Sequence, residues 1–70
     1  MDDRYPAPET IKARRLACEL TQERAGELVH ATGRQWRTYE AGTRKMHPAF
    51  WELFEIKSVV YFNQAKNRIR

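Results

Sequence analysis

The chain has 70 residues, of which 31% are charged and 41% hydrophobic, and its formal net charge is +4. This length fits one small domain, and so short a chain often needs a partner subunit to complete its core. The single cysteine excludes an internal disulfide, no apolar run approaches the roughly 20 residues needed to span a bilayer, and no signal peptide is visible. We therefore expect a protein of the bacterial cytoplasm whose positive charge suits a partner rich in phosphate.

The N-terminal residues 1–7 are predicted to form an arm. Pro6 and Pro8 keep this part of the chain extended, and Pro8 also suits the first turn of a helix. The first helix is accordingly predicted over residues 8–18. Its polar side chains expected in solvent are Lys12, Arg14 and Glu19.

Arg15 lies on the same predicted helix side as Ile11 and Cys18. An arginine in apolar surroundings needs an acidic partner, because an unpaired buried charge is costly. Cys18 could in principle serve as a nucleophile with a histidine as its base. No catalytic pattern flanks it, however, and free cysteine usually behaves as a small buried hydrophobe. We expect a core residue and no enzymatic activity.

The second helix is predicted over residues 22–29, with Thr21 as its N-cap. Gly26 lies inside this helix and costs about 0.8–1 kcal/mol relative to alanine. A glycine at that position indicates that another helix approaches closely. His30 and the two residues after it are predicted to form a short turn.

The third helix lies within residues 32–42 and has two different faces. Thr32 suits the N-cap position, Gln35 can complete a capping box, and Gly42 suits the left-handed conformation after the last turn. One predicted face is aromatic and acidic, and the other is basic and polar. The first face holds Trp36, Tyr39 and Glu40, and the second holds Arg34, Arg37, Thr38 and Ala41.

A basic loop at residues 43–47 leads into a fourth helix that begins at Pro48. This helix carries more aromatic and aliphatic side chains than one covered face requires. Residues 59–62, V-V-Y-F, are β-branched and aromatic, which is typical of strands. We favour a continuation of the helix, with a strand that pairs with a second subunit as the alternative.

Residues 20–42 resemble the lambda repressor/Cro-like, or Xre-type, helix-turn-helix DNA-binding family. The resemblance is carried by L-T-Q-E at 20–23, the small Gly26, Trp36 in the apolar position of the third helix, and Y-E-A-G at 39–42. It implies an all-α, compact four- to five-helix domain over residues 8–58. Residues 59–70 would then hold a dimerisation segment and a basic tail that touches phosphate.

The resemblance also implies roles for individual residues. An arginine of the first helix pairs with the glutamate that ends the third, which here gives Arg15 and Glu40. Residues early in the third helix read base edges in the major groove, and the residues around them hold the phosphate backbone. The implied base contacts are Gly33, Arg34, Arg37 and Thr38. The implied phosphate contacts are Gln22, Thr32, Gln35, Arg44 and Lys45.

Two positions depart from the family pattern. His30 stands where a glycine is usual, so it must adopt a left-handed conformation, which histidine tolerates better than most residues. Gly33 takes the first recognition position and brings no side chain, so base readout must depend on Arg34, Arg37 and Thr38. No target sequence can therefore be transferred from the family.

A homodimer is the expected assembly, held together by residues 50–62; the alternative is that these residues complete a monomer core. The predicted function is a repressor of its own promoter, bound to an inverted repeat in double-stranded DNA with half-sites about 10 base pairs apart. Residues 34–54 are similar to small phage anti-CRISPR-associated repressors. An antitoxin that binds a toxin protein and its own operator is the alternative. No metal, cofactor or membrane partner is expected. The predicted interface residues are Phe50, Trp51, Phe54, Val59, Tyr61 and Phe62.

Overall fold

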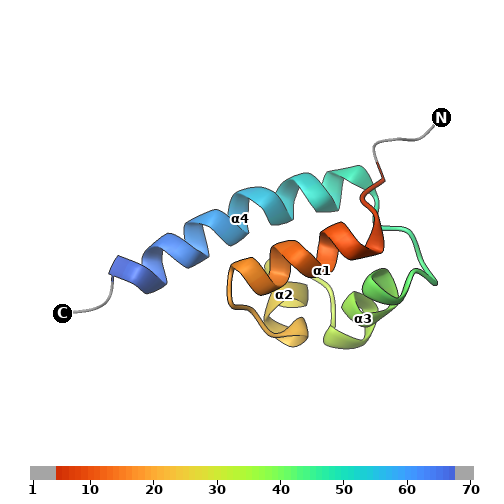
Figure 1. The fold of residues 1–70 in the computed structure, drawn as a ribbon, viewed down its shortest axis with the longest axis horizontal. Helices are drawn as coiled ribbons and strands as arrows, with labels where there is room; N and C mark the ends of the chain where they lie inside the picture. The colour runs from red at the N-terminus through yellow and green to blue at the C-terminus, as the bar shows by residue number, and fades with distance from the viewer. Residues whose placement is uncertain (1–4, 68–70) are drawn as a thin grey trace.

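A computed structural model of the chain describes residues 5–67, with side chains through residue 64. Four helices follow one another: α1 (Pro8–Ala17), α2 (Gln22–Leu28), α3 (Gly33–Ala41) and α4 (Pro48–Asn67) (Figure 1). The described residues contain no strand, so the predicted all-α class is confirmed. Residues 1–4 of the predicted arm, and the side chains of the tail at residues 66–70 that are predicted to touch phosphate, lie outside what the structure describes.

Side-chain caps define where α2 and α3 begin. The Thr21 hydroxyl accepts a hydrogen bond from the Arg24 backbone amide at 3.1 Å. At the start of α3, Thr32 and Gln35 form a complete capping box, with both bonds at 3.0 Å. Gly42 ends α3 with φ of 84°, a left-handed conformation that costs a glycine little. Local sequence is thus sufficient to place both ends of α3.

Two residues other than glycine adopt positive φ angles within the described chain, and both lie in turns after a helix. His30 follows α2 with φ of 61°, in keeping with its place at the usual glycine position. Glu19 follows α1 with φ of 59°. There the chain turns so sharply that the Leu20 backbone amide bonds the Arg15 carbonyl at 3.1 Å. The left-handed Glu19 was not expected from its residue type, because glutamate is not enriched in this conformation.

Gly26 marks a point of close approach, but what approaches is backbone and not the side of another helix. A Cβ atom at this position would lie 2.8 Å from the Thr32 carbonyl oxygen and 2.9 Å from that of Ala31. The Ala31 backbone amide also bonds the Gly26 carbonyl at 2.8 Å. A side chain at residue 26 would therefore push the turn, and the start of α3, away from α2.

The hydrophobic core is centred on Trp36, which α3 buries completely. Its ring packs 4.7 Å from the Phe54 ring of α4, measured between centroids, and 6.2 Å from that of Tyr39. One aromatic side chain therefore joins α3 to α4. The other buried hydrophobic residues are Ile11, Cys18, Leu20, Ala25, Val29 and Met46.

Helix α4 continues without a break through residues 59–62, so the alternative of a strand does not form. Backbone hydrogen bonds within the helix satisfy these β-branched and aromatic residues without a second subunit. The helix runs past the other three, and the longest dimension of the molecule is 46 Å (Figure 1). Within the described residues, no helix has the length and apolar character that a membrane crossing requires.

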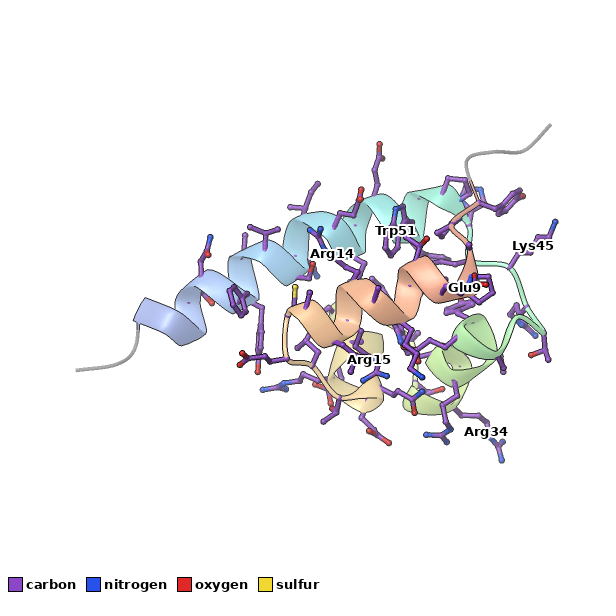
Figure 2. The ribbon with its side chains drawn as sticks, viewed as in Figure 1. Glu9, Arg14, Arg15, Arg34, Lys45 and Trp51 are labelled. Atoms are coloured by element: carbon purple, nitrogen blue, oxygen red, sulfur yellow. The ribbon has the colours of Figure 1, made fainter. Side chains whose placement is uncertain are left out.

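Arg14 fastens α4 to α1 and is not the solvated residue that the sequence indicates (Figure 2). Its Nη2 donates to the Glu55 carbonyl at 3.1 Å, and its Nε donates to the Ser58 hydroxyl at 3.3 Å. Ser58 is fully buried, so this contact satisfies a polar group inside the interface between the two helices. Only the packing of α4 shows that Arg14 faces inward.

The prediction that Phe54 belongs to a dimer interface is wrong. Its side chain is 0% exposed and lies between the rings of Trp36 and Trp51, the latter at 5.9 Å between centroids. A partner subunit cannot touch this ring without opening the core. The error arises because helical spacing identifies an apolar face without saying whether it is covered by the same chain or by another.

Candidate nucleic-acid interface

The polar face of α3 is turned to solvent. Arg34 and Arg37 are exposed, whereas Gly33 and Thr38 are half-buried. Figure 2 shows Arg34 pointing away from the body of the molecule. The Arg34 side chain has no hydrogen bond or ion pair with another described residue, so all five of its N–H donors are available to a ligand.

Arg37 has a partner in the preceding helix. Its Nη1 lies 3.4 Å from the Oε2 of Glu23, a residue of α2. The two side chains are 52% and 68% exposed, so water screens their attraction, and such pairs contribute about 0–1 kcal/mol to stability. The contact therefore contributes little to folding, but it places a carboxylate beside a guanidinium group on the exposed face.

An internal hydrogen bond limits how the Thr38 side chain can contact a DNA base. Its hydroxyl donates a hydrogen bond to the Gln35 carbonyl at 2.6 Å, which uses its only proton. The oxygen lone pairs and the methyl group remain. This threonine is therefore suited to accept from the amino group of cytosine or adenine, or to pack against a thymine methyl.

Gly33 has a structural role that its lack of a side chain does not reveal in the sequence. A Cβ atom there would lie 2.8 Å from Cγ and 3.2 Å from Cα of Glu23. The glycine lets the first turn of α3 rest directly on α2. As a predicted base contact, Gly33 can offer only backbone.

Behind α3, the Glu40 carboxylate joins three helices. It receives Arg15 from α1 through two bonds, Nε to Oε2 at 2.5 Å and Nη2 to Oε1 at 3.1 Å. It also accepts from Trp36 Nε1 at 2.5 Å and from Gln22 Nε2 at 3.1 Å. The structure thus brings the predicted Arg15–Glu40 pair together, and the two side chains are 11% and 6% exposed.

Opposing effects act on the pKa of Glu40. Burial by itself raises this pKa, but hydrogen bonds from Arg15, Trp36 and Gln22, together with the charge of Arg15, outweigh burial. The net result is a pKa below the ordinary glutamate value of 4.5. The folded state therefore favours the ionised carboxylate, and the guanidinium group is its main partner.

This shift predicts a pH dependence of stability. Because the folded pKa is lowered, the stabilisation is fully present above the ordinary value of 4.5 and is lost as the pH falls below it. We expect the difference in melting temperature between wild type and Glu40→Gln to shrink as the pH falls from neutral to about 3. Other carboxyl groups titrate in both proteins, so the difference isolates Glu40. A constant difference would show that ionisation of Glu40 is not linked to folding.

The residues predicted to contact phosphate surround α3, and several also have structural partners. The Gln22 amide nitrogen is bound to Glu40, so Gln22 braces α3 from α2. Thr32 and Gln35 use acceptor atoms in the capping box, which leaves the hydroxyl proton of one and the amide protons of the other as donors. In the loop after α3, Arg44 and Lys45 are exposed.

Lys45 lies above the ring of Tyr5, with Nζ 5.4 Å from the ring centroid, and extends from the edge of the molecule (Figure 2). Residues 31–48 carry four cations and one acid. That acid is Glu40, which points into the protein and is neutralised by Arg15. The outward charge of this segment is consequently all positive. A surface of this kind attracts polyanions from a distance.

The site also has a member that sequence reasoning missed. The sequence assigns Glu23 to neither the base contacts nor the phosphate contacts, yet it lies against Gly33 and pairs with Arg37. Its distance from Arg37 along the chain hides this relation, which arises from the angle between α2 and α3. Across the part of the chain that the structure describes, no group of three or more His, Cys, Asp or Glu residues could hold a metal ion.

Part of the chain is similar to a known protein. No protein-family model matches the chain. The chain is 34% identical over 50 residues to the type II methyltransferase M.MspI of a Moraxella species. The matched part is 71% of this chain but only 12% of the methyltransferase. The chain therefore spans a small portion of this much longer relative.

Proposed function

We propose that this protein is a sequence-specific DNA-binding regulator that acts as a homodimer on an inverted repeat and represses its own promoter. The observation that carries the proposal is the construction of α3. Its outer face presents Arg34 and Arg37 to solvent, while its inner face is fixed by Trp36 and Glu40. A rigid helix with solvent-exposed guanidinium groups suits the major groove, where arginine pairs with guanine.

The comparison and the surrounding charge fit this assignment. Similarity to part of a type II methyltransferase is in keeping with a DNA partner. The exposed Arg44 and Lys45 extend the positive surface beyond α3. In a complex, these loop cations would hold phosphates and set the register of the helix, without contributing sequence preference.

The homodimer is supported by apolar residues that α4 leaves in solvent. Ile56 is 64% exposed, Val60 50%, and Val59 and Phe50 43% each. Three of them, residues 56, 59 and 60, follow helical spacing and form one stripe. Trp51, Tyr61 and Phe62 are half-buried, so they have less surface to offer a second subunit. We place the subunit contact on this stripe, with Ile56 and Val60 added to the residues predicted from sequence.

The test is selection of bound duplexes from a random DNA pool, followed by sequencing of the enriched sites. An enriched inverted repeat, with half-sites about 10 base pairs apart, is the expected result. Enrichment of an isolated half-site would support sequence-specific DNA binding but contradict binding as a homodimer. Salt-sensitive binding to all sequences without enrichment would contradict sequence-specific regulation.

Arg34→Ala should weaken binding to the selected site by about 1–3 kcal/mol and relax the preference at one or two base pairs. The reason is that Arg34 projects freely from α3 and its removal disturbs no internal contact. Repeating the selection with the variant measures both effects. An unchanged site preference would remove Arg34 from base readout.

Lys45→Ala should weaken binding to every duplex alike and reduce the slope of log K against log salt by about 1. Lys45 lies in the loop and not on α3, so its expected partner is the DNA backbone. Titrations of specific and random duplexes at several salt concentrations measure the slope. A loss confined to the specific duplex would contradict the phosphate assignment.

An antitoxin remains the second candidate because the same α4 stripe would also fit a toxin protein. The stripe is apolar and exposed, which marks surfaces that bind proteins. Expression of the chain with the neighbouring gene, followed by purification, tests this alternative. A stable complex in which Ile56→Glu abolishes binding would favour the antitoxin, whereas a homodimer disrupted by the same change favours the plain regulator.

A further inference from the structure

Glu23 is the acidic residue that lies against the proposed DNA-reading face. Its side chain is 68% exposed, and its Oε2 is 3.4 Å from Arg37 Nη1. A bare carboxylate near DNA is unfavourable because the phosphate backbone repels it. Its presence beside Arg37, one of the proposed recognition arginines, therefore calls for a role in the complex.

The contact uses one particular part of the Arg37 guanidinium. Glu23 occupies Nη1, which leaves the edge formed by Nε and Nη2 open. That edge carries two parallel N–H donors, the arrangement that matches O6 and N7 of guanine. Arg15 shows the same use of the group in this protein, since its Nε and Nη2 grip the two oxygens of Glu40.

Gly33 makes the contact between Glu23 and α3 possible. A Cβ atom at this position would lie 2.8 Å from Glu23 Cγ and 3.3 Å from its Cδ, so any side chain would displace the carboxylate. Because Gly33 has no side chain, Glu23 of α2 can pack against the start of α3. From there its carboxylate reaches the side chain of Arg37.

We infer that Glu23 is a positioning residue for Arg37, which it orients so that the Nε–Nη2 edge is presented to a guanine. The inference rests on the proposed function. Arginine has many rotamers, and ordering it on a base costs conformational entropy. A carboxylate that restrains the guanidinium beforehand reduces this cost, and the attraction strengthens when DNA excludes water from the pair.

The experiment compares selected sites for wild type, Arg37→Ala, Glu23→Gln, Glu23→Asp and the double variant Glu23→Gln/Arg37→Ala. The base pair whose preference is lost in Arg37→Ala defines the one that Arg37 reads. Glu23→Gln removes the charge, and Glu23→Asp shortens the side chain, which lengthens a contact that already measures 3.4 Å. Both should reduce discrimination at that same base pair by about threefold to tenfold. In the Arg37→Ala background, Glu23→Gln should have no further effect on discrimination.

Glu27→Gln is the matched control. Glu27 lies one turn further along α2, is 62% exposed, and pairs with Arg24 at 2.7 Å. The Glu27→Gln substitution removes one negative charge from α2, as Glu23→Gln does, but at a residue that does not contact α3. The base preference of the selected sites should therefore not change. Thermal unfolding of all variants checks that the exposed substitutions leave the fold intact.

Three results would overturn the inference. Tighter binding of Glu23→Gln to all duplexes, with the same base preference as wild type, would show that the carboxylate only repels phosphate. An Arg37→Ala variant with unchanged preference would show that Arg37 reads no base. The third result is a wild type that enriches no sequence; the proposed function then fails, and the inference fails with it. The first two results overturn the inference alone and leave the proposed function standing.

Discussion

Glu40→Ala is expected to reduce the free energy of unfolding by about 3–5 kcal/mol, because it leaves the Arg15 guanidinium buried without its counter-ion. The substitution also removes the acceptor for Trp36 Nε1 and Gln22 Nε2. A chain of this length has a total stability of only about 3–10 kcal/mol, at roughly 0.05–0.15 kcal/mol per residue. The variant should therefore be partly or largely unfolded at ambient temperature.

Urea denaturation followed by circular dichroism measures this loss. Glu27→Ala provides the control, because its exposed pair with Arg24 should contribute less than about 1 kcal/mol. The Arg15→Ala/Glu40→Ala double variant should lose less stability than the sum of the two single variants. Strict additivity would show that the two side chains do not stabilise the fold through each other.

Phe54→Ala, as a separate single variant, is expected to reduce the free energy of unfolding by about 3–5 kcal/mol, because it opens a cavity beside Trp36. The ring is fully buried and contacts two tryptophans, so little of the lost packing can be recovered. This effect should appear in the monomer and should not depend on protein concentration. It separates a core residue from an interface residue, whose removal weakens association.

Val59→Ala is the matched control on the same helix, since its side chain is 43% exposed. It should leave the monomer within about 0.5 kcal/mol of wild type. Sedimentation across a range of concentrations then reports self-association for both variants. A Phe54→Ala protein with wild-type monomer stability but weakened association would restore Phe54 to the interface.

The helices of this protein follow from short-range chemistry that is visible in the chain. The hydroxyls of Thr21 and Thr32 each accept a hydrogen bond from a backbone amide three residues further along, and Gly42 takes the left-handed conformation that ends α3. Such contacts depend on neighbours along the sequence, so they are predictable, and α1, α2 and α3 begin and end within one residue of their expected bounds. Residue type alone does not separate helix from strand at residues 59–62, because β-branched and aromatic residues are enriched in strands, and the structure extends α4 through them.

The amino-acid pattern is sufficient to predict an all-α chain with a capped basic helix, and it indicates that Arg15 needs an acid. Which surfaces are covered depends on how the helices pack: Arg14 turns toward α4, Phe54 is enclosed beside Trp36, and Ile56 stays exposed. The same packing brings Glu23 against α3. The physical reason is that caps and periodicity act over one or two turns, whereas burial and long-range pairing depend on the angles at which whole helices pack.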